Sequence, residues 1–409
     1  MKKTILALSL LAPAAAFSLG MPAPALSADD PEIIVPDSTG FKFTDVTLVK
    51  TTPVKDQNKS GTCWCFSGLS MLEEDILRKG GPEVDLSEMW VVRNAYIDKA
   101  KKYIRTDGNV NFAQGGGFPD VLYVADTYGL MPEEAYQGLN YGEKKHSHYE
   151  MADALKAYLD AIMKNPNKKL STAWLPGYIG ILDAYLGKAP ETFTYNGKTY
   201  TPRQFADELG VKEADFIDVT SFTHHPFYTT FPLEIADNWL WAPSYNVPLD
   251  ELKAIVDNAL NNGYSIGWGA DVSEGGFKWR QGYAVLPEPK SEADMEGTEL
   301  SRWVQLSDKD REKATFDIKG PVKEKTVTQQ SRQDAFDNKE TTDDHGMTIV
   351  GIATDQEGNK YYKVKNSWDT NQLYGGYFYV SEPYFLEKTV SIMVNKGAVP
   401  SNIAKKMNL

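Results

Sequence analysis

The spacing of apolar residues predicts a helix with one buried face near the N-terminal end of the chain. Over residues 62–79, apolar side chains recur at intervals of three and four, which is typical of a helix with one buried stripe. The stripe consists of Cys65, Leu69, Leu72 and Ile76. Glycines and a proline at 80–82 end this helix, and the hydroxyl of Ser87 is predicted to cap the next one.

The pattern changes to that of strands in the C-terminal part of the chain. The predicted strands are 348–352, 361–365, 375–380 and 390–394. A turn at 355–358 joins the first two of them. Residues 140–250 are predicted to form a mostly helical insertion, with a hairpin turn at Asn196 and Gly197. We therefore expect an α+β fold with a helical N-terminal lobe, a helical insertion and a β-rich C-terminal lobe.

The first residues have the order of a cleavable export signal. Lys2 and Lys3 precede an apolar run over 4–17, and small residues follow over 23–28. A membrane anchor is the alternative, but the run is shorter than the about 20 residues that span a bilayer. We expect residues 1–28 to be removed and the protein to be periplasmic or secreted, with no stable membrane span.

The charge balance makes nucleic acid an unsuitable partner. The 409 residues include 43 Lys and Arg against 56 Asp and Glu, which gives a formal net charge of −13. A protein that binds nucleic acid neutralises phosphates with basic side chains. An acidic chain of this kind is not expected to do so.

The sequence contains two cysteines, Cys63 and Cys65, so it has no disulfide framework. On a helix, positions i and i+2 point about 200° apart, which is poor geometry for a bridge between them. Cys63 begins the predicted helix, where unpaired N–H groups and the helix dipole favour a thiolate. Gln57 lies in the loop before it and is placed to form an oxyanion hole with the backbone of Cys63. The alternative is that both cysteines are small buried residues, and we expect Cys65 to have that role.

His345 and Asn366 are predicted to meet across the C-terminal hairpin. The four-residue turn places Thr354 opposite Asn359 and Met347 opposite Asn366, so His345 is diagonal to Asn366, about 7–8 Å away along the backbone. The amide would orient an imidazole that acts first as a base and then as an acid. Trp368 is expected to cover their hydrogen bond.

The other histidines are expected to be structural. They are His146, His148, His224 and His225. Neither pair has neighbours at the spacing of a common metal motif, so no metal site is predicted.

The motifs around these residues are similar to those of the papain superfamily of cysteine peptidases. The matching blocks occur in order and span about residues 41–396. They are 52–57, 63–67, 86–88, 116–119, 344–346 and 365–368. An ordered set of this kind is far more specific than any single motif.

The length of the chain points to one branch of that superfamily. His345 lies 282 residues after Cys63, whereas short papain-type enzymes separate the two by about 130–150. The longer spacing resembles the bleomycin hydrolase, or aminopeptidase C, branch. The resemblance implies one peptidase domain over 29–400, which includes the insertion at about 140–250, and a C-terminal tail over 401–409.

The resemblance also implies roles for individual residues. Cys63 is the nucleophile, His345 the general base, Asn366 the residue that orients it, and Gln57 the oxyanion donor. The implied substrate contacts are Gly116, Gly117, Asp344 and Trp368. A peptide or protein is the implied substrate, and no metal or organic cofactor is implied.

Two features depart from the family. Its members are mostly intracellular, and its aminopeptidases end in a longer tail whose C-terminal carboxylate holds the substrate amino group. Here nine residues follow Pro400, and an Asp or Glu from the insertion is the alternative partner for that amino group. The favoured function is an exported aminopeptidase. The alternatives are an endopeptidase with an open cleft and a catalytically silent binding protein, and assembly into a homo-oligomer is left open.

Overall fold

The computed structural model describes residues 40–166, 168–289, 295 and 297–409. The predicted export signal over 1–28 lies outside these residues and stays a prediction. None of the described helices is both long enough and apolar enough to cross a membrane.

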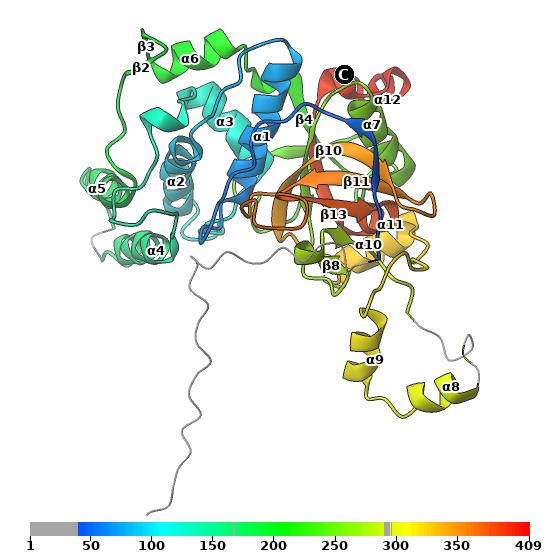
Figure 1. The fold of residues 1–409 in the computed structure, drawn as a ribbon. Coiled ribbons are helices and arrows are strands. Elements are labelled where there is room, and N and C mark those ends of the chain that lie inside the picture. Colours follow the sequence, from blue (N-terminus) through cyan, green and yellow to red (C-terminus); the bar gives the residue numbers. More distant parts are fainter. Residues whose placement is uncertain (1–39, 167, 290–294, 296) are drawn as a thin grey trace, which may run out of the picture. The chain divides into compact units, whose positions relative to one another are not determined.

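Helices dominate the first half of the described chain (Figure 1). They are α1 (Cys63–Arg78), α2 (Glu88–Arg105), α3 (Phe118–Tyr128), α4 (Tyr149–Met163), α5 (Trp174–Leu186) and α6 (Pro202–Leu209). The small hairpin of β2 (Phe193–Tyr195) and β3 (Lys198–Tyr200) turns where it was predicted. Ser87 caps α2 as predicted, because its hydroxyl accepts a hydrogen bond from the backbone N–H of Trp90.

The second half of the chain builds one mixed sheet. In order of pairing, its strands are β5 (Thr230–Pro232), β6 (Pro243–Asn246), β4 (Phe216–Thr220), β13 (Thr389–Asn395), β7 (Ile266–Ala270), β10 (His345–Thr354), β11 (Lys360–Lys365), β12 (Tyr377–Ser381), β9 (Tyr283–Ala284) and β8 (Phe277–Lys278). β1 (Thr44–Leu48) also pairs with β10. The predicted α+β class, with a helical part and a β-rich part, is confirmed.

The remaining helices follow or interrupt the strands. They are α7 (Leu249–Asn261), α8 (Gly297–Trp303), α9 (Asp308–Thr315), α10 (Gln329–Asp337), α11 (Glu382–Lys388) and α12 (Ser401–Met407). Short 3₁₀ turns occur at Glu133–Ala135, Glu213–Asp215, Trp279–Gln281 and Lys396–Ala398.

The predicted helical insertion is correct only up to residue 209. From residue 216 the chain contributes β4, β5 and β6 to the main sheet. Every residue of β4 is buried, so this strand lacks the alternation of exposed and buried positions that reveals a strand in a sequence. The prediction of a mostly helical segment is therefore wrong for 216–246.

The hairpin of β10 and β11 has the predicted turn but a shifted register beside it. Thr354 pairs with Lys360, whereas the sequence predicted Asn359 as its partner. A bulge at Val350 removes this offset, so Thr348 pairs with Lys365 as expected. The end of the hairpin that carries His345 and Asn366 therefore has the register that the sequence predicted.

Helix α1 is buried on nearly all of its faces. The predicted apolar stripe is buried, but so are three consecutive acids, Glu73, Glu74 and Asp75. The helix packs against β10 and β7 on one side and against α2 and α3 on the other. The sequence predicted one buried stripe, and the burial of the other faces between the helices and the sheet was not predicted.

A lysine from the sheet reaches the acids of α1. Lys365 Nζ lies 3.2 Å from Glu74 Oε1, and both side chains are almost fully buried, at 4% and 0% exposure. The ammonium also donates hydrogen bonds to the hydroxyls of Thr52 and Ser70. Burial raises the pKa of Glu74, and the charge of Lys365 opposes that rise. This ion pair fixes the end of β11 to α1.

The C-terminal tail forms α12 beside α7 (Figure 1). Ile403 and Met407 are buried in the hydrophobic cluster that α7 shares with the sheet. Lys406 pairs with Glu251 of α7, and the backbone N–H of Leu409 donates to the carbonyl of Ala404. The tail is therefore an integral helix of the fold.

The buried pair of Lys365 and Glu74 gives a prediction for stability. Lys365→Met should lower the free energy of unfolding by about 3–5 kcal/mol, because it leaves the Glu74 carboxylate buried and unpaired. Urea unfolding followed by circular dichroism measures this loss. The double variant Lys365→Met, Glu74→Leu should recover most of it, since no buried charge remains.

A matched control removes a lysine from an exposed pair. Lys198 pairs with Glu208 at the surface, so Lys198→Met should leave the unfolding midpoint almost unchanged. If Lys365→Met were no more damaging than Lys198→Met, the buried pair would not hold β11 to α1.

Candidate active site

Five of the eight predicted site residues line one cavity. They are Cys63, Gly116, Gly117, Asp344 and His345. The cavity lies where the start of α1 and the loop before α3 meet the strands β4, β6, β7 and β13. Gln57, Asn366 and Trp368 are not among its lining residues; Asn366 and Trp368 contact His345, and Gln57 contacts Ser367.

His345 is held by the two residues that the sequence placed beside it. Its Nε2 lies 2.8 Å from Asn366 Oδ1. The backbone N–H of Ser367 donates to the same oxygen, so the oxygen accepts, the imidazole proton is on Nε2, and Nδ1 is left as the basic nitrogen. The ring of Trp368 stacks on the imidazole with centroids 4.5 Å apart. Trp368 therefore covers this hydrogen bond, as expected.

Cys63 is the first residue of α1 and its side chain is partly exposed. Burial raises the pKa of its thiol to about 11, and hydrogen bonds with the backbone of Gly346 and Trp64 only partly oppose that rise. The expected effect of the helix N-terminus is thus outweighed by loss of water. Gly346 lets the two segments approach closely, because an added Cβ would lie 3.2 Å from the Cα of Trp64 and would require a small shift of α1.

Burial acts on His345 in the opposite sense. It lowers the pKa of the imidazole to about 4, although the hydrogen bond to Asn366 favours the charged form. Near neutral pH, neither the thiol of Cys63 nor the imidazole of His345 therefore becomes charged by itself. The pair holds one proton between about pH 4 and about pH 11, and a transfer of that proton from sulfur to nitrogen creates both charges together.

The amide of Gln57 is fixed in one orientation. Its Oε1 accepts a hydrogen bond from the hydroxyl of Ser367 at 2.7 Å, and its Nε2 donates to the carbonyl of Ser60 at 2.7 Å. The amide nitrogen has a second N–H that neither contact uses. The backbone N–H of Gln57 also donates to Ser367. The Gln57 loop is therefore joined directly to the residue after Asn366.

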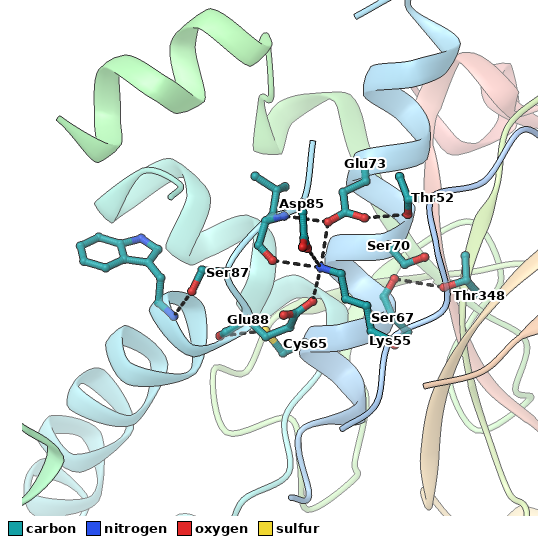
Figure 2. Close-up of polar contacts among 12 residues, drawn as sticks. Thr52, Lys55, Cys65, Ser67, Ser70, Glu73, Asp85, Ser87, Glu88 and Thr348 are labelled. Carbon is teal, nitrogen blue, oxygen red and sulfur yellow. Dashed lines mark hydrogen bonds and ion pairs between the residues drawn. The ribbon is translucent and has the colours of Figure 1, made fainter. Parts of the chain in front are cut away.

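Lys55 fastens this loop to two helices (Figure 2). Its Nζ lies 3.1 Å from a carboxylate oxygen of Glu73 on α1 and 2.7 Å from one of Glu88 on α2. Asp85 lies 2.6 Å away from the same ammonium. Figure 2 shows these three carboxylates around the one lysine. Cys65 is buried at the same interface, where its thiol donates to the carbonyl of Glu88, so it has the packing role that was expected.

The loop at 113–117 is held by buried charges that the sequence analysis missed. Lys99 donates to the carbonyls of Ala113 and Gly115. Asp120 accepts from the backbone N–H of Gly117 and from the indole N–H of Trp239. A Cβ on Gly116 would lie 2.5 Å from the carboxylate of Asp120. The loop can therefore lie this close to Asp120 only because residue 116 is glycine.

The cavity is acidic. Five aspartates line it: Asp120, Asp218, Asp237, Asp343 and Asp344. Burial raises the pKa of three of them, Asp120, Asp218 and Asp343, to about 7. None of the described lining residues is Lys or Arg. Of these aspartates the sequence analysis named only Asp344; the position of Asp343 beside it was the one available signal for another.

Comparison with known protein families agrees with this geometry. A family model described as "Papain family cysteine protease" matches residues 41–173, and one described as "Peptidase C1-like family" matches residues 310–409. Together they cover more than half of the chain. The chain belongs to the papain family of cysteine peptidases.

Individual relatives place this papain-family peptidase more closely. Aminopeptidase C of Lactobacillus helveticus is 22% identical over 406 residues, which cover 87% of this chain and 82% of that protein. Bleomycin hydrolase of Rattus norvegicus is 23% identical over 410 residues, which cover 88% and 84%. The predicted resemblance to this branch is confirmed.

A solved structure has the same fold. The crystal structure of PepW from Lactobacillus rhamnosis HN001 aligns with a TM-score of 0.67 and 19% sequence identity. The alignment covers 89% of this chain and 84% of that one. The papain-like fold predicted from the motifs is confirmed.

The two cysteines give a prediction about thiol reactivity. In the folded protein, iodoacetamide should modify Cys63, which opens to the cavity, and leave Cys65, which is fully buried. The rate should stay nearly constant from about pH 5 to about pH 10, because the pair with His345 holds one proton throughout. Peptide mass spectrometry at several pH values measures both results.

The variant His345→Ala provides the contrast. The thiol of Cys63 then titrates alone, so the alkylation rate should rise about tenfold per pH unit towards its pKa of about 11. The same rising profile in the unchanged protein would show that Cys63 and His345 do not share a proton.

Proposed function

We propose that this papain-family peptidase is an exported aminopeptidase that acts through Cys63, His345 and Asn366. The supporting observation for the site is that Cys63 and His345 line one cavity while Asn366 fixes the tautomer of His345. The proposal of export rests on the order of basic, apolar and small residues over 1–28.

The proposed reaction passes through a thioester. Cys63 Sγ attacks the carbonyl carbon of the peptide bond as His345 Nδ1 takes the thiol proton. The carbon–nitrogen bond then breaks, and His345 gives the proton to the departing amine. Water, deprotonated by His345, attacks the thioester and releases the acid together with the restored thiol. The N–H groups of Cys63 and Gln57 would stabilise the oxyanion in both steps.

The proposed specificity rests on the acidic cavity. An aminopeptidase must hold the substrate ammonium beside the bond that it cleaves, and a carboxylate is the natural partner. Asp343 and Asp237 are the acids whose charges act on Cys63, and both line the cavity. Asp237 comes from the segment at 140–250, which the sequence analysis named as a source of such a residue. The Leu409 carboxylate follows α12 beside α7 and is not among the cavity residues.

An endopeptidase is the second candidate. In this chain α12 packs on α7, so the tail does not close the cavity. The same aspartates would then bind a cationic side chain of an internal residue. A catalytically silent binding protein has less support, since it has no need for a thiol beside a tautomer-fixed imidazole.

The nucleophile is tested by removing each cysteine separately. Cys63→Ala should abolish peptide hydrolysis, because no other thiol lines the described part of the cavity. Cys65→Ala is the matched control and should keep most of the activity, since this thiol is buried between α1 and α2. Release of a fluorophore from a peptide substrate measures both. Activity in Cys63→Ala that equals that of Cys65→Ala would refute the site.

The specificity is tested with free-amino and N-blocked versions of one peptide. The free-amino substrate should be cleaved with the higher kcat/KM. Asp343→Asn should lower kcat/KM for that substrate by about 10- to 100-fold, as expected for loss of a charged hydrogen bond, with little change for the blocked one. Asp207→Asn, which alters an exposed carboxylate on α6, is the control. Equal cleavage of both substrates by the unchanged protein would favour the endopeptidase.

A further inference from the structure

We propose that His224, His225 and Glu234 form a binding site for a divalent transition metal of the Zn²⁺ class. Their ligand atoms all lie within 4.8 Å of one another. Within the described residues this is the one group of three or more His, Cys, Asp or Glu with such geometry. The sequence analysis gave both histidines a structural role, because Glu234 joins them only in the folded chain.

The distances suit a single ion. His224 Nε2 lies 3.0 Å from one carboxylate oxygen of Glu234, and His225 Nε2 lies 2.8 Å from the other. Zn²⁺ binds imidazole nitrogen and carboxylate oxygen at about 2.0–2.2 Å in a tetrahedral arrangement. Neighbouring donors in that arrangement are therefore a little over 3 Å apart, so a small outward shift of the donors would admit the ion. Two histidines and one carboxylate leave a fourth position for water.

The backbone that carries the two histidines is fixed from inside. The buried side chain of Asn246 donates to the carbonyls of Phe222 and His225 and accepts from the N–H of Phe222. The ring of His225 stacks on Phe231 with centroids 4.0 Å apart. A site whose ligands are already held costs less conformational entropy to fill.

Gln333 stands behind His224 in the position that usually supports a metal ligand. Both atoms of its amide approach His224 Nδ1, Nε2 at 3.1 Å and Oε1 at 3.4 Å. The nearer contact is the amide N–H, which donates to Nδ1 in the metal-free protein; with a metal on Nε2, the amide oxygen would instead accept a hydrogen bond from Nδ1–H. Histidine ligands characteristically donate their other N–H to such an acceptor.

The site is accessible and lies on the outer face of the cavity wall. His224 and Glu234 are exposed and His225 is partly exposed, so an ion can enter from solvent. Leu233 and Ile235, on either side of Glu234 in the chain, both line the cavity. A metal on Glu234 would therefore restrain the segment that forms this wall. The proposal does not depend on the peptidase reaction.

The test uses the chain with Cys63→Ala, because a thiol beside His345 would bind Zn²⁺ by itself. Calorimetric titration with Zn²⁺ should show saturable binding of one equivalent, and the ion should raise the thermal midpoint. His225→Gln in the same chain should weaken this binding at least 100-fold. Co²⁺ in place of Zn²⁺ should give the visible absorption of a four-coordinate site, and His225→Gln should abolish it.

Two comparisons keep the result decisive. Glu208→Gln removes another exposed carboxylate and should leave Zn²⁺ affinity unchanged. His225→Gln should melt at the same temperature as its parent without metal, which separates loss of a ligand from loss of fold. Absence of saturable binding, or equal affinity in His225→Gln and its parent, would overturn the proposal, and the His–Glu contacts would then be surface ion pairs only.

Discussion

Two lysines that meet carboxylates inside the protein hold the site in place. Lys55 pairs with Glu73, and Lys365 pairs with Glu74, so neighbouring acids of α1 receive cations from opposite ends of the chain. A buried charge without a partner costs several kcal/mol. Few arrangements of the Lys55 loop, α1 and the end of β11 therefore satisfy both pairs. Each lysine closely precedes a residue of the proposed site: Lys55 comes two before Gln57, and Lys365 comes directly before Asn366. We infer that these pairs set the register of both segments against the helix that begins with the reactive thiol.

Loss of water is the second constraint, and it acts on every ionisable group of the cavity in the same way. It raises the pKa of the Cys63 thiol and of the aspartates, and it lowers the pKa of His345. The uncharged form of each group is favoured because a low-dielectric interior penalises isolated charge. Charge is then stable only in pairs. In the proposed reaction, a proton that moves from sulfur to imidazole would make one such pair, and a substrate cation beside Asp343 would make another.

The segment at 216–246 contributes to two places in the structure. On one side, Asp218, Leu233 and Ser244 line the cavity. On the other, Glu234 meets the two histidines. The chain turns at Glu234, where the N–H of Ile235 donates to the carbonyl of Leu233, so one short stretch contributes both to the cavity wall and to the proposed metal site. Residues that line the cavity and a ligand of the proposed metal site are thus adjacent in sequence.

The sequence by itself determined the parts whose signals are local. The order of motifs predicted the family, the spacing of apolar residues predicted the first helix, and the hairpin register predicted the contact between His345 and Asn366. That register is correct near the site because a bulge at Val350 cancels an error at the turn. Strand β4 was missed, since a strand buried on both faces has no alternating pattern. The lysine–carboxylate pairs, the acidic cavity and the His–Glu cluster join residues far apart in the chain. Only the tertiary structure decides which distant charges meet and how much water they lose, and that determines their pKa values.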